Sequence, residues 1–240
     1  MVKLSLRKKK KELQSSNVAR KLVTFTETKS HVIEQFRTIR TNIRFSMPDE
    51  PLKTILITSS TPGEGKSTNA ANLGVVFAQE DKKVLIIDAD MRKPTLHHTF
   101  KTFNKVGLSN ILARRSVLQE AIQETFIVGL DVITSGPIPP NPAELLSSQG
   151  LDALFDEVKK LYDIIIIDSP PLLSVTDAQI LANKCDGAIM ILNTGVIDKR
   201  AAKKAQMLLS ASHTKILGVV LNNCKTTNHY HYYDGYRYAE

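Results

Sequence analysis

Apolar residues follow a repeating pattern along most of the chain. Short runs that are apolar throughout and rich in β-branched residues occupy 54–58, 83–88, 130–134, 163–168, 187–192 and 215–221. Between most of them lie segments long enough for helices, such as 66–79, 176–183 and 199–210. Continuously apolar strands that alternate with helices are typical of a parallel sheet with right-handed crossovers. The pattern predicts an α/β fold with helices on both faces of a parallel sheet.

A helical pattern precedes the first run. Apolar side chains recur there at helical spacing, at Val32, Ile33, Phe36, Ile39 and Ile43. This spacing predicts an amphipathic helix over 31–46, which the prolines of 47–51 end because proline cannot continue a helix. Residues before this helix lack either periodicity, and the last residues are polar and rich in tyrosine. We therefore expect a flexible basic segment over 1–30, a catalytic domain over 31–221 and a tail over 222–240.

The net charge of +8 is concentrated at the amino end. Six basic residues precede the first acid, namely Lys3, Arg7, Lys8, Lys9, Lys10 and Lys11. They leave only +2 for the rest of the chain, so the domain is not a basic nucleic-acid-binding surface, and no nucleic acid is expected as its partner. Three interpretations of the basic arm stay open: a solvated tail, attraction to anionic lipid, and contact with nucleic acid.

Two protein classes are disfavoured by the composition. No apolar run approaches the roughly 20 residues that a membrane-spanning helix needs. Cys185 and Cys224 belong to no metal-binding or redox spacing, and they are interpreted as buried or incidental thiols of a reducing cytoplasm.

The strongest chemical signal is the segment 59–68, Ser-Ser-Thr-Pro-Gly-Glu-Gly-Lys-Ser-Thr, which follows a predicted strand and opens a predicted helix. This is the context of a phosphate-binding loop, where glycines let backbone N–H groups surround a phosphate and the helix dipole adds attraction. Lys66 is expected to reach the β and γ phosphates of ATP, and Ser67 to ligate Mg²⁺. Ser60 stands where the strict pattern has glycine, and a small residue there is compatible with the turn. The predicted nucleotide-binding residues are Pro62, Gly63, Glu64, Gly65, Lys66, Ser67 and Thr68.

Carboxylates end two of the predicted strands. Asp88 and Asp90 follow one apolar run, and Asp168 ends another. The carboxyl ends of parallel strands meet at one edge of the sheet, where ligands bind. Asp168 has the form of a Walker B acid that holds Mg²⁺, with Asp88 close to the same ion. Asp88 and Asp90, two residues apart in extended backbone, are expected to point the same way.

These motifs together resemble the bacterial tyrosine kinases that serve exopolysaccharide and capsule synthesis, in the stand-alone cytoplasmic form. The segment 88–94, Asp-Ala-Asp-Met-Arg-Lys-Pro, is similar to the Walker A′ element of that family. The segments 34–42, 135–145 and 176–178 are similar to its sequence as well. The resemblance covers about residue 30 to the end, and it implies a P-loop fold related to that of partition ATPases.

The resemblance also implies substrates and partners. It makes the five tail tyrosines the autophosphorylation sites, which are Tyr230, Tyr232, Tyr233, Tyr236 and Tyr238. It makes Glu34, Arg37 and Arg40 contacts of a homo-oligomeric ring, and places Asn222 near the adenine. It further implies a separate membrane adaptor that recruits the kinase to the inner face of the membrane, and a phosphatase that reverses the reaction. The exogenous substrates, the polysaccharide pathway and the ring size are left open.

The expected mechanism is transfer of the γ-phosphoryl group to a tyrosine oxygen. Lys66 holds the phosphates, Asp168 and Ser67 organise Mg²⁺, and Asp88 or Asp90 accepts or orients the phenol proton. The last strand should end at the same sheet edge as the loop, so the tail leaves close to the site. Two alternatives stay open: a partition-type ATPase, although its signature lysine is missing near Thr61, and a nucleotide-gated scaffold without catalysis.

Overall fold

The computed structural model describes residues 22–26, 30–47 and 52–224. A seven-stranded sheet in this part of the chain has the order β3-β4-β2-β5-β1-β6-β7. The strands are β1 (Thr54–Ser59), β2 (Val84–Asp88), β3 (Ile122–Glu124), β4 (Leu130–Ile133), β5 (Ile164–Asp168), β6 (Gly187–Asn193) and β7 (Lys215–Asn222). All neighbours are parallel except β3 and β4, which are antiparallel. The predicted parallel sheet is confirmed, and each expected strand ends within two residues of the position predicted for it.

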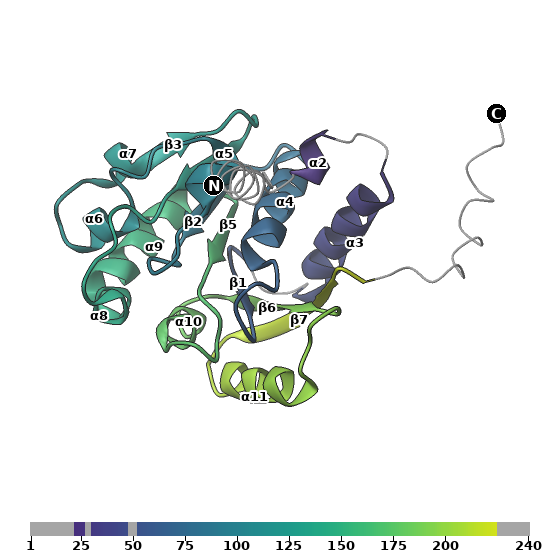
Figure 1. The fold of residues 1–240 in the computed structure, drawn as a ribbon. Helices are drawn as coiled ribbons and strands as arrows, with labels where there is room; N and C mark the ends of the chain where they lie inside the picture. Colours follow the sequence, from purple (N-terminus) through teal and green to yellow (C-terminus); the bar gives the residue numbers. More distant parts are fainter. Residues whose placement is uncertain (1–21, 27–29, 48–51, 225–240) are drawn as a thin grey trace, which may run out of the picture.

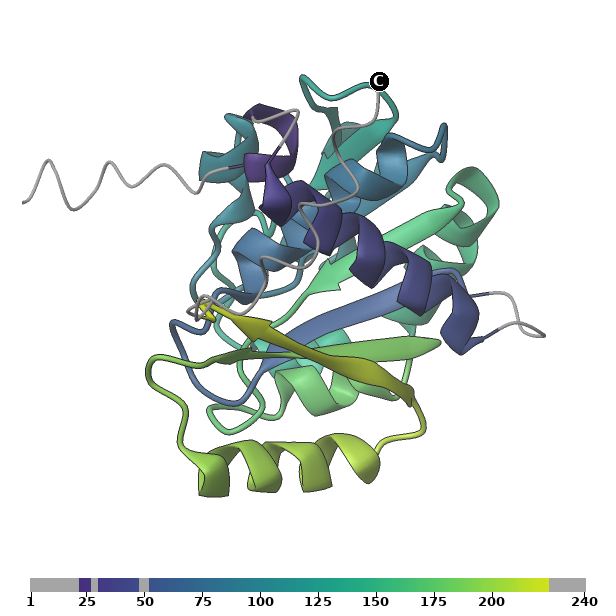
Figure 2. The ribbon, with the colours of Figure 1, turned by 90° about the vertical axis from the view of Figure 1, so that its right-hand side faces the viewer.

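Helices cover both faces of the sheet, as predicted (Figure 1). One face packs against α3 (His31–Ser46), α4 (Lys66–Ala78) and α5 (Leu96–Phe100). The other packs against α6 (Leu108–Leu112), α7 (Leu118–Ala121), α8 (Pro142–Ser147), α9 (Gln149–Leu161), α10 (Asp177–Ala182) and α11 (Lys199–Ser210). Figure 2 shows α3 and α11 on opposite sides of β6 and β7.

The central strands are largely apolar because each face of the sheet needs its own core. Along β1, Ile55 and Ile57 pack into the core beneath α4, whereas Leu56 packs into the opposite core. Along β2, Val84 and Ile86 alternate in the same way with Leu85 and Ile87. Successive side chains of a strand point to opposite faces, so a sheet buried on both sides has no polar alternation.

Two elements differ from the expectations. The lead-in was expected to lack regular structure, which is wrong for α2 (Val23–Thr26), because Thr24 is buried and hydrogen-bonds Asn72 of α4. The antiparallel strand β3 was not predicted, and its three residues are too few for a periodic signal. The helix predicted over 31–46 is confirmed as α3. The division of the chain at residues 30 and 221 stays a prediction.

Candidate active site

The predicted phosphate-binding loop connects β1 to α4. Gly63 and Gly65 have φ angles of +85° and +91°, which are backbone conformations that glycine adopts at no steric cost. A Cβ atom at Gly65 would also lie 2.2 Å from the side-chain nitrogen of Asn222, so a larger residue is excluded there. Ser60 has no positive φ and therefore needs no glycine. Lys66, Ser67 and Thr68 form the first turn of α4, as the motif requires.

Asp88 and Asp168 lie side by side at the carboxyl ends of β2 and β5. They are paired in the register of the two strands, and both are fully buried. One oxygen of Asp88, Oδ2, accepts hydrogen bonds from the N–H groups of Thr95 and Leu96, at 2.9 and 3.0 Å. Its other oxygen is buried and has no hydrogen-bond partner among the described residues. Burial and the charge of Asp168 raise the pKa of Asp88 to about 7.

This arrangement fits a divalent cation. A buried carboxylate oxygen without a hydrogen-bond donor, next to a second carboxylate, is stabilised by a positive charge. The described residues contain no group of three or more His, Cys, Asp or Glu that could hold a metal ion on their own. Mg²⁺ is commonly bound by one or two carboxylates together with substrate phosphates, so two acids and the Ser67 hydroxyl suit it.

Lys66 joins the loop to the acids. Its Nζ donates to Asp90 Oδ2 at 2.9 Å, and Asp90 Oδ1 accepts from the N–H of Lys93 at 3.0 Å. Burial lowers the pKa of Lys66, but the charges of Asp168, Asp90 and Asp88 outweigh this effect and the pKa lies above its ordinary value. The structure therefore brings the four predicted catalytic residues together, while their individual roles stay predictions.

An ion pair that the sequence reasoning missed holds the Asp90 segment in place. Arg92 binds the fully buried carboxylate of Asp177 through two hydrogen bonds of 3.0 and 3.1 Å. Asp177 begins α10, so the pair ties the turn after β2 to that helix. Arg92 and Asp177 both lie in segments that carry the family resemblance, and this was the one sequence signal that could have identified the pair.

Asn222 lies at the end of β7, against the phosphate loop. Its Nδ2 donates to the carbonyl oxygen of Glu64 at 2.9 Å, and its own carbonyl accepts from the N–H of Thr194 at 3.0 Å. Its expected contact with adenine stays a prediction. The five tail tyrosines and the basic arm lie outside the described residues.

The predicted oligomer contacts lie on α3. Glu34 and Arg37 form an ion pair of 2.8 Å, and about half of each side chain is exposed. Arg40 instead turns to α4, where it donates to the carbonyl oxygen of Val76, and it pairs at 2.7 Å with Glu80, which follows that helix. Only 12% of its side chain is exposed, so Arg40 has a role within its own chain.

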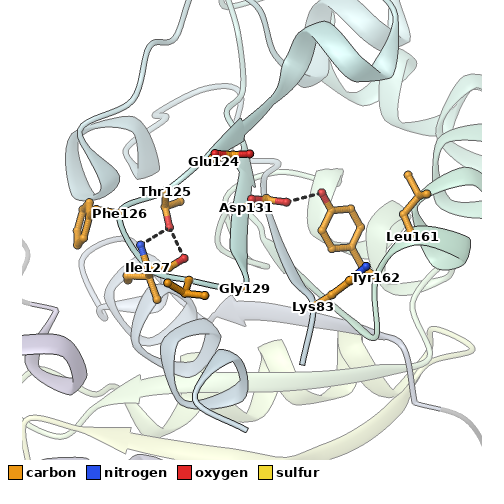
Figure 3. Close-up of a pocket in the computed structure, with 10 residues that line it drawn as sticks. Lys83, Glu124, Thr125, Phe126, Ile127, Gly129, Asp131, Leu161 and Tyr162 are labelled. Atoms are coloured by element: carbon orange, nitrogen blue, oxygen red, sulfur yellow. Dashed lines mark hydrogen bonds between the residues drawn. The ribbon is translucent and has the colours of Figure 1, made fainter. Parts of the chain in front are cut away.

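A cavity of about 610 Å³ opens at the other edge of the sheet, near the amino ends of β2, β4 and β5 (Figure 3). Tyr162 points to Asp131 there, and its hydroxyl donates to that carboxylate at 2.8 Å. No residue of the phosphate loop lines this cavity, so it is not the predicted nucleotide site.

Comparison with known proteins shows which family this chain resembles. A domain family described as an AAA domain matches residues 52–209. The tyrosine-protein kinase YwqD of Bacillus subtilis is 49% identical over 219 residues, which cover 91% of this chain and 92% of that protein. The crystal structure of the chimerical protein CapA2B2 is 45% identical, with a TM-score of 0.83 over 85% of this chain and 90% of that one.

A more distant match shares the fold. The septum site-determining protein MinD of Pyrococcus horikoshii, solved with Mg-ADP, is 26% identical, with a TM-score of 0.62 over 71% of this chain and 70% of that one. The identity to the kinase is nearly twice as high and extends over nine-tenths of both chains. The predicted P-loop fold and enzyme class are thereby confirmed, and the chain belongs to the family of bacterial tyrosine-protein kinases.

Proposed function

We propose that this kinase transfers the γ-phosphoryl group of Mg-ATP to tyrosines of its own C-terminal segment, Tyr230, Tyr232, Tyr233, Tyr236 and Tyr238. The observation that carries the proposal is the position of Asn222. The last strand ends on the phosphate loop itself, through the hydrogen bond from Asn222 to Glu64. Tyr232 follows Asn222 by ten residues, which span roughly 33 Å when extended. The tail therefore reaches the site of its own chain or that of a neighbour.

The site residues divide the work as follows. Gly63, Gly65 and the first turn of α4 hold the phosphates with backbone N–H groups, and Lys66 exchanges Asp90 for the β and γ phosphates. Ser67, Asp88 and Asp168 would hold Mg²⁺, which would neutralise charge on the phosphates.

The incoming phenol needs a group that takes its proton. A tyrosine with a pKa near 10 arrives protonated, and Asp88 or Asp90 orients it and accepts that proton. Phosphoryl transfer has a loose transition state, so positioning and charge compensation contribute more than base strength. Removal of Lys66 therefore costs more activity than neutralising either Asp88 or Asp90.

Mass spectrometry after incubation with Mg-ATP tests the substrate assignment. We expect phosphate on the tail tyrosines of the wild-type chain and none on a variant with all five changed to phenylalanine. ATP hydrolysis without phosphotyrosine would instead indicate a partition-type ATPase. A chain that binds ATP but transfers no phosphoryl group to any offered tyrosine would be a scaffold.

The proposed assembly is a homo-oligomeric ring that contacts its neighbours through Glu34, Arg37 and Arg40. The exposed Glu34–Arg37 pair supports this, since it is available to a second subunit. Arg37→Ala is the sharper test, because Arg40→Ala also removes the contacts with α4. Light scattering should show a smaller particle for Arg37→Ala at unchanged thermal stability. An unchanged particle mass would mean that the Glu34–Arg37 face is a solvent-exposed surface and not a subunit contact.

The proposed setting is exopolysaccharide or capsule synthesis at the inner face of the cell membrane, with a membrane adaptor as activator and a phosphatase as the opposing enzyme. No helix in the described part of the chain is long and apolar enough to cross a membrane, so the proposal assigns recruitment to the partner. A cytoplasmic peptide of that partner should stimulate tail phosphorylation. Full activity of the isolated chain at low concentration would contradict this.

A further inference from the structure

Glu64 lies in the phosphate loop, yet its side chain is almost fully buried. The residues before it, Pro62 and Gly63, are exposed, whereas Glu64 is only 1% exposed. A buried carboxylate is costly unless hydrogen-bond donors compensate for the lost water. A side chain in a surface loop that nevertheless turns inward therefore needs a structural reason.

The Glu64 carboxylate accepts two hydrogen bonds from the beginning of its own loop. Glu64 Oε2 accepts from the hydroxyl of Ser60 and from the N–H of Thr61, both at 2.8 Å. Since Glu64 stands four residues after Ser60, these two bonds close the loop on itself. The N–H of Thr61 is thereby directed to Glu64, which leaves phosphate binding to the N–H groups further along.

The same residue connects the loop to two strand ends. Glu64 Oε1 accepts from the N–H of Asn193 at the end of β6, at 3.4 Å. The carbonyl oxygen of Glu64 accepts from Asn222 at the end of β7. The loop is thus held from within by a carboxylate and from outside by the two neighbouring strands.

This network accounts for the departure of the loop from the strict glycine pattern. Ser60 stands where that pattern has glycine, it is 2% exposed, and its hydroxyl is the donor that Glu64 requires. Backbone freedom at this position is replaced by a side-chain contact. Ser60 and Glu64 should therefore act as a pair.

We propose that Glu64 is a positioning residue, whose carboxylate holds the phosphate loop in its nucleotide-binding shape by joining Ser60, Thr61 and the end of β6. The inference deepens the proposed function, because it rests on the loop being the ATP-phosphate site. Glu64 touches no reacting atom in this role. Its loss should weaken nucleotide binding more than it slows transfer from bound ATP.

The test compares Glu64→Gln with wild type in the full chain. Glutamine keeps the size but replaces one of the two acceptor oxygens by an NH₂ donor, so it cannot keep both the bonds to Ser60 and Thr61 and the bond to Asn193. Loss of a hydrogen bond to a charged group is expected to raise the Kd for a fluorescent ATP analogue about tenfold. The KM for ATP should rise with it, while kcat at saturating ATP changes less than about threefold.

A double-mutant cycle with Ser60→Ala isolates the pair. The effect of Glu64→Gln on Kd should be clearly smaller in the Ser60→Ala background, because one of the lost bonds is already absent. Glu80→Gln is the matched control, since it breaks ion pairs with Arg40 and Arg44 away from the loop. It should lower thermal stability and leave Kd unchanged.

An unchanged Kd in a folded Glu64→Gln variant would overturn the proposal, and so would additive effects of Ser60→Ala and Glu64→Gln. An equal rise of Kd in Glu80→Gln would also overturn it, by showing that general destabilisation is the cause. Failure of the proposed function gives another result. Wild type would then bind the ATP analogue but phosphorylate no tail tyrosine, and the Kd values of wild type and Glu64→Gln could still be compared.

Discussion

The two edges of the sheet use carboxylates in opposite ways. At the amino edge, Asp186 accepts hydrogen bonds from the N–H groups of Lys53 and Thr54, at 2.9 and 2.8 Å, and Asp163 accepts from that of Lys83 at 2.9 Å. At the carboxyl edge, Asp88 and Asp168 lie next to each other. Burial alone would raise the pKa of Asp186, but these hydrogen bonds outweigh it and the pKa is lowered.

The difference follows from the polarity of the backbone. The amino ends of parallel strands present N–H groups, which carboxylates satisfy, so the acids there stabilise the fold. The carboxyl ends present carbonyl oxygens, so clustered acids require positive charges from elsewhere. Lys66, the start of α5 and a bound cation can supply them. An acid whose pKa a neighbouring carboxylate raises, despite its hydrogen bonds to N–H groups, therefore indicates a site. An acid whose pKa is lowered by such hydrogen bonds indicates a structural role.

Lys66→Met should produce the largest effect, because it removes the positive side chain that is bonded to Asp90 and whose charge lies next to Asp88 and Asp168. We expect loss of tail phosphorylation by at least about 100-fold, in a folded protein. Lys159→Met is the control, since Lys159 pairs with Asp186 at the amino edge, at 3.3 Å. Phosphotyrosine labelling of both variants measures the difference. Labelling of Lys66→Met at the wild-type rate would mean that the assigned site is wrong.

Asp168→Asn and Asp186→Asn should have opposite consequences. The first removes a charge that repels Asp88, so activity should be lost while stability in metal-free buffer is unchanged or higher. The second removes charge-assisted hydrogen bonds and should cost about 1.5–3 kcal/mol of unfolding free energy, with activity retained by the folded protein. Chemical unfolding and tail labelling test both. Equal destabilisation by the two substitutions would show that the acids of both edges have the same structural role.

The pH dependence of stability should follow Asp186. Because its pKa is lower in the folded state than in the unfolded state, its contribution is present above the ordinary pKa and is lost as pH falls through the folded value. The stability difference between wild type and Asp186→Asn should therefore be full near neutrality and shrink below about pH 4. Urea unfolding from pH 7 to pH 3 measures it. If the stability difference between the two proteins grew as pH falls, the pKa of Asp186 would be raised and not lowered by folding.

Tyr162→Phe should have the smallest effect. It removes the hydrogen bond to Asp131 and should cost about 1 kcal/mol, with no change in phosphorylation rate. Unfolding of the single variants and of Tyr162→Phe with Asp131→Asn gives the coupling energy. Lost activity in Tyr162→Phe would connect the cavity of Figure 3 to the active site.

The sequence alone predicted what depends on local pattern. The six long strands, α3, α4 and the loop between β1 and α4 follow from apolar runs, helical spacing and a motif. The strand β3 was missed, because its three residues are too few to show a periodic pattern. The helix α2 was missed because its Thr24 is buried by Asn72, forty-eight residues later.

Site residues were predictable where the chemistry requires a particular side chain, as for Lys66, Asp88 and Asp168. The contacts of Glu64 and Arg40 were not predictable. No local pattern indicates that the Glu64 side chain turns inward to Ser60, Thr61 and Asn193, and Arg40 binds residues that are distant in the sequence. The sequence predicted Glu64 only as one of several nucleotide-binding loop residues, and Arg40 as part of a charged helix face. In the structure, the Glu64 side chain is buried inside the loop, and Arg40 contacts Val76 of α4 and pairs with Glu80.

The end of β7 beside the phosphate loop also sets a competition between substrates. A segment tethered ten residues from the site has an effective concentration on the order of millimolar. A free protein at micromolar concentration then competes poorly for the same γ-phosphoryl group, unless it docks elsewhere on the kinase. Under the proposed function, the tail is thus a built-in competitor that is consumed as its tyrosines are modified. Exogenous phosphorylation would then begin after a lag, and its length would report the number of tail tyrosines.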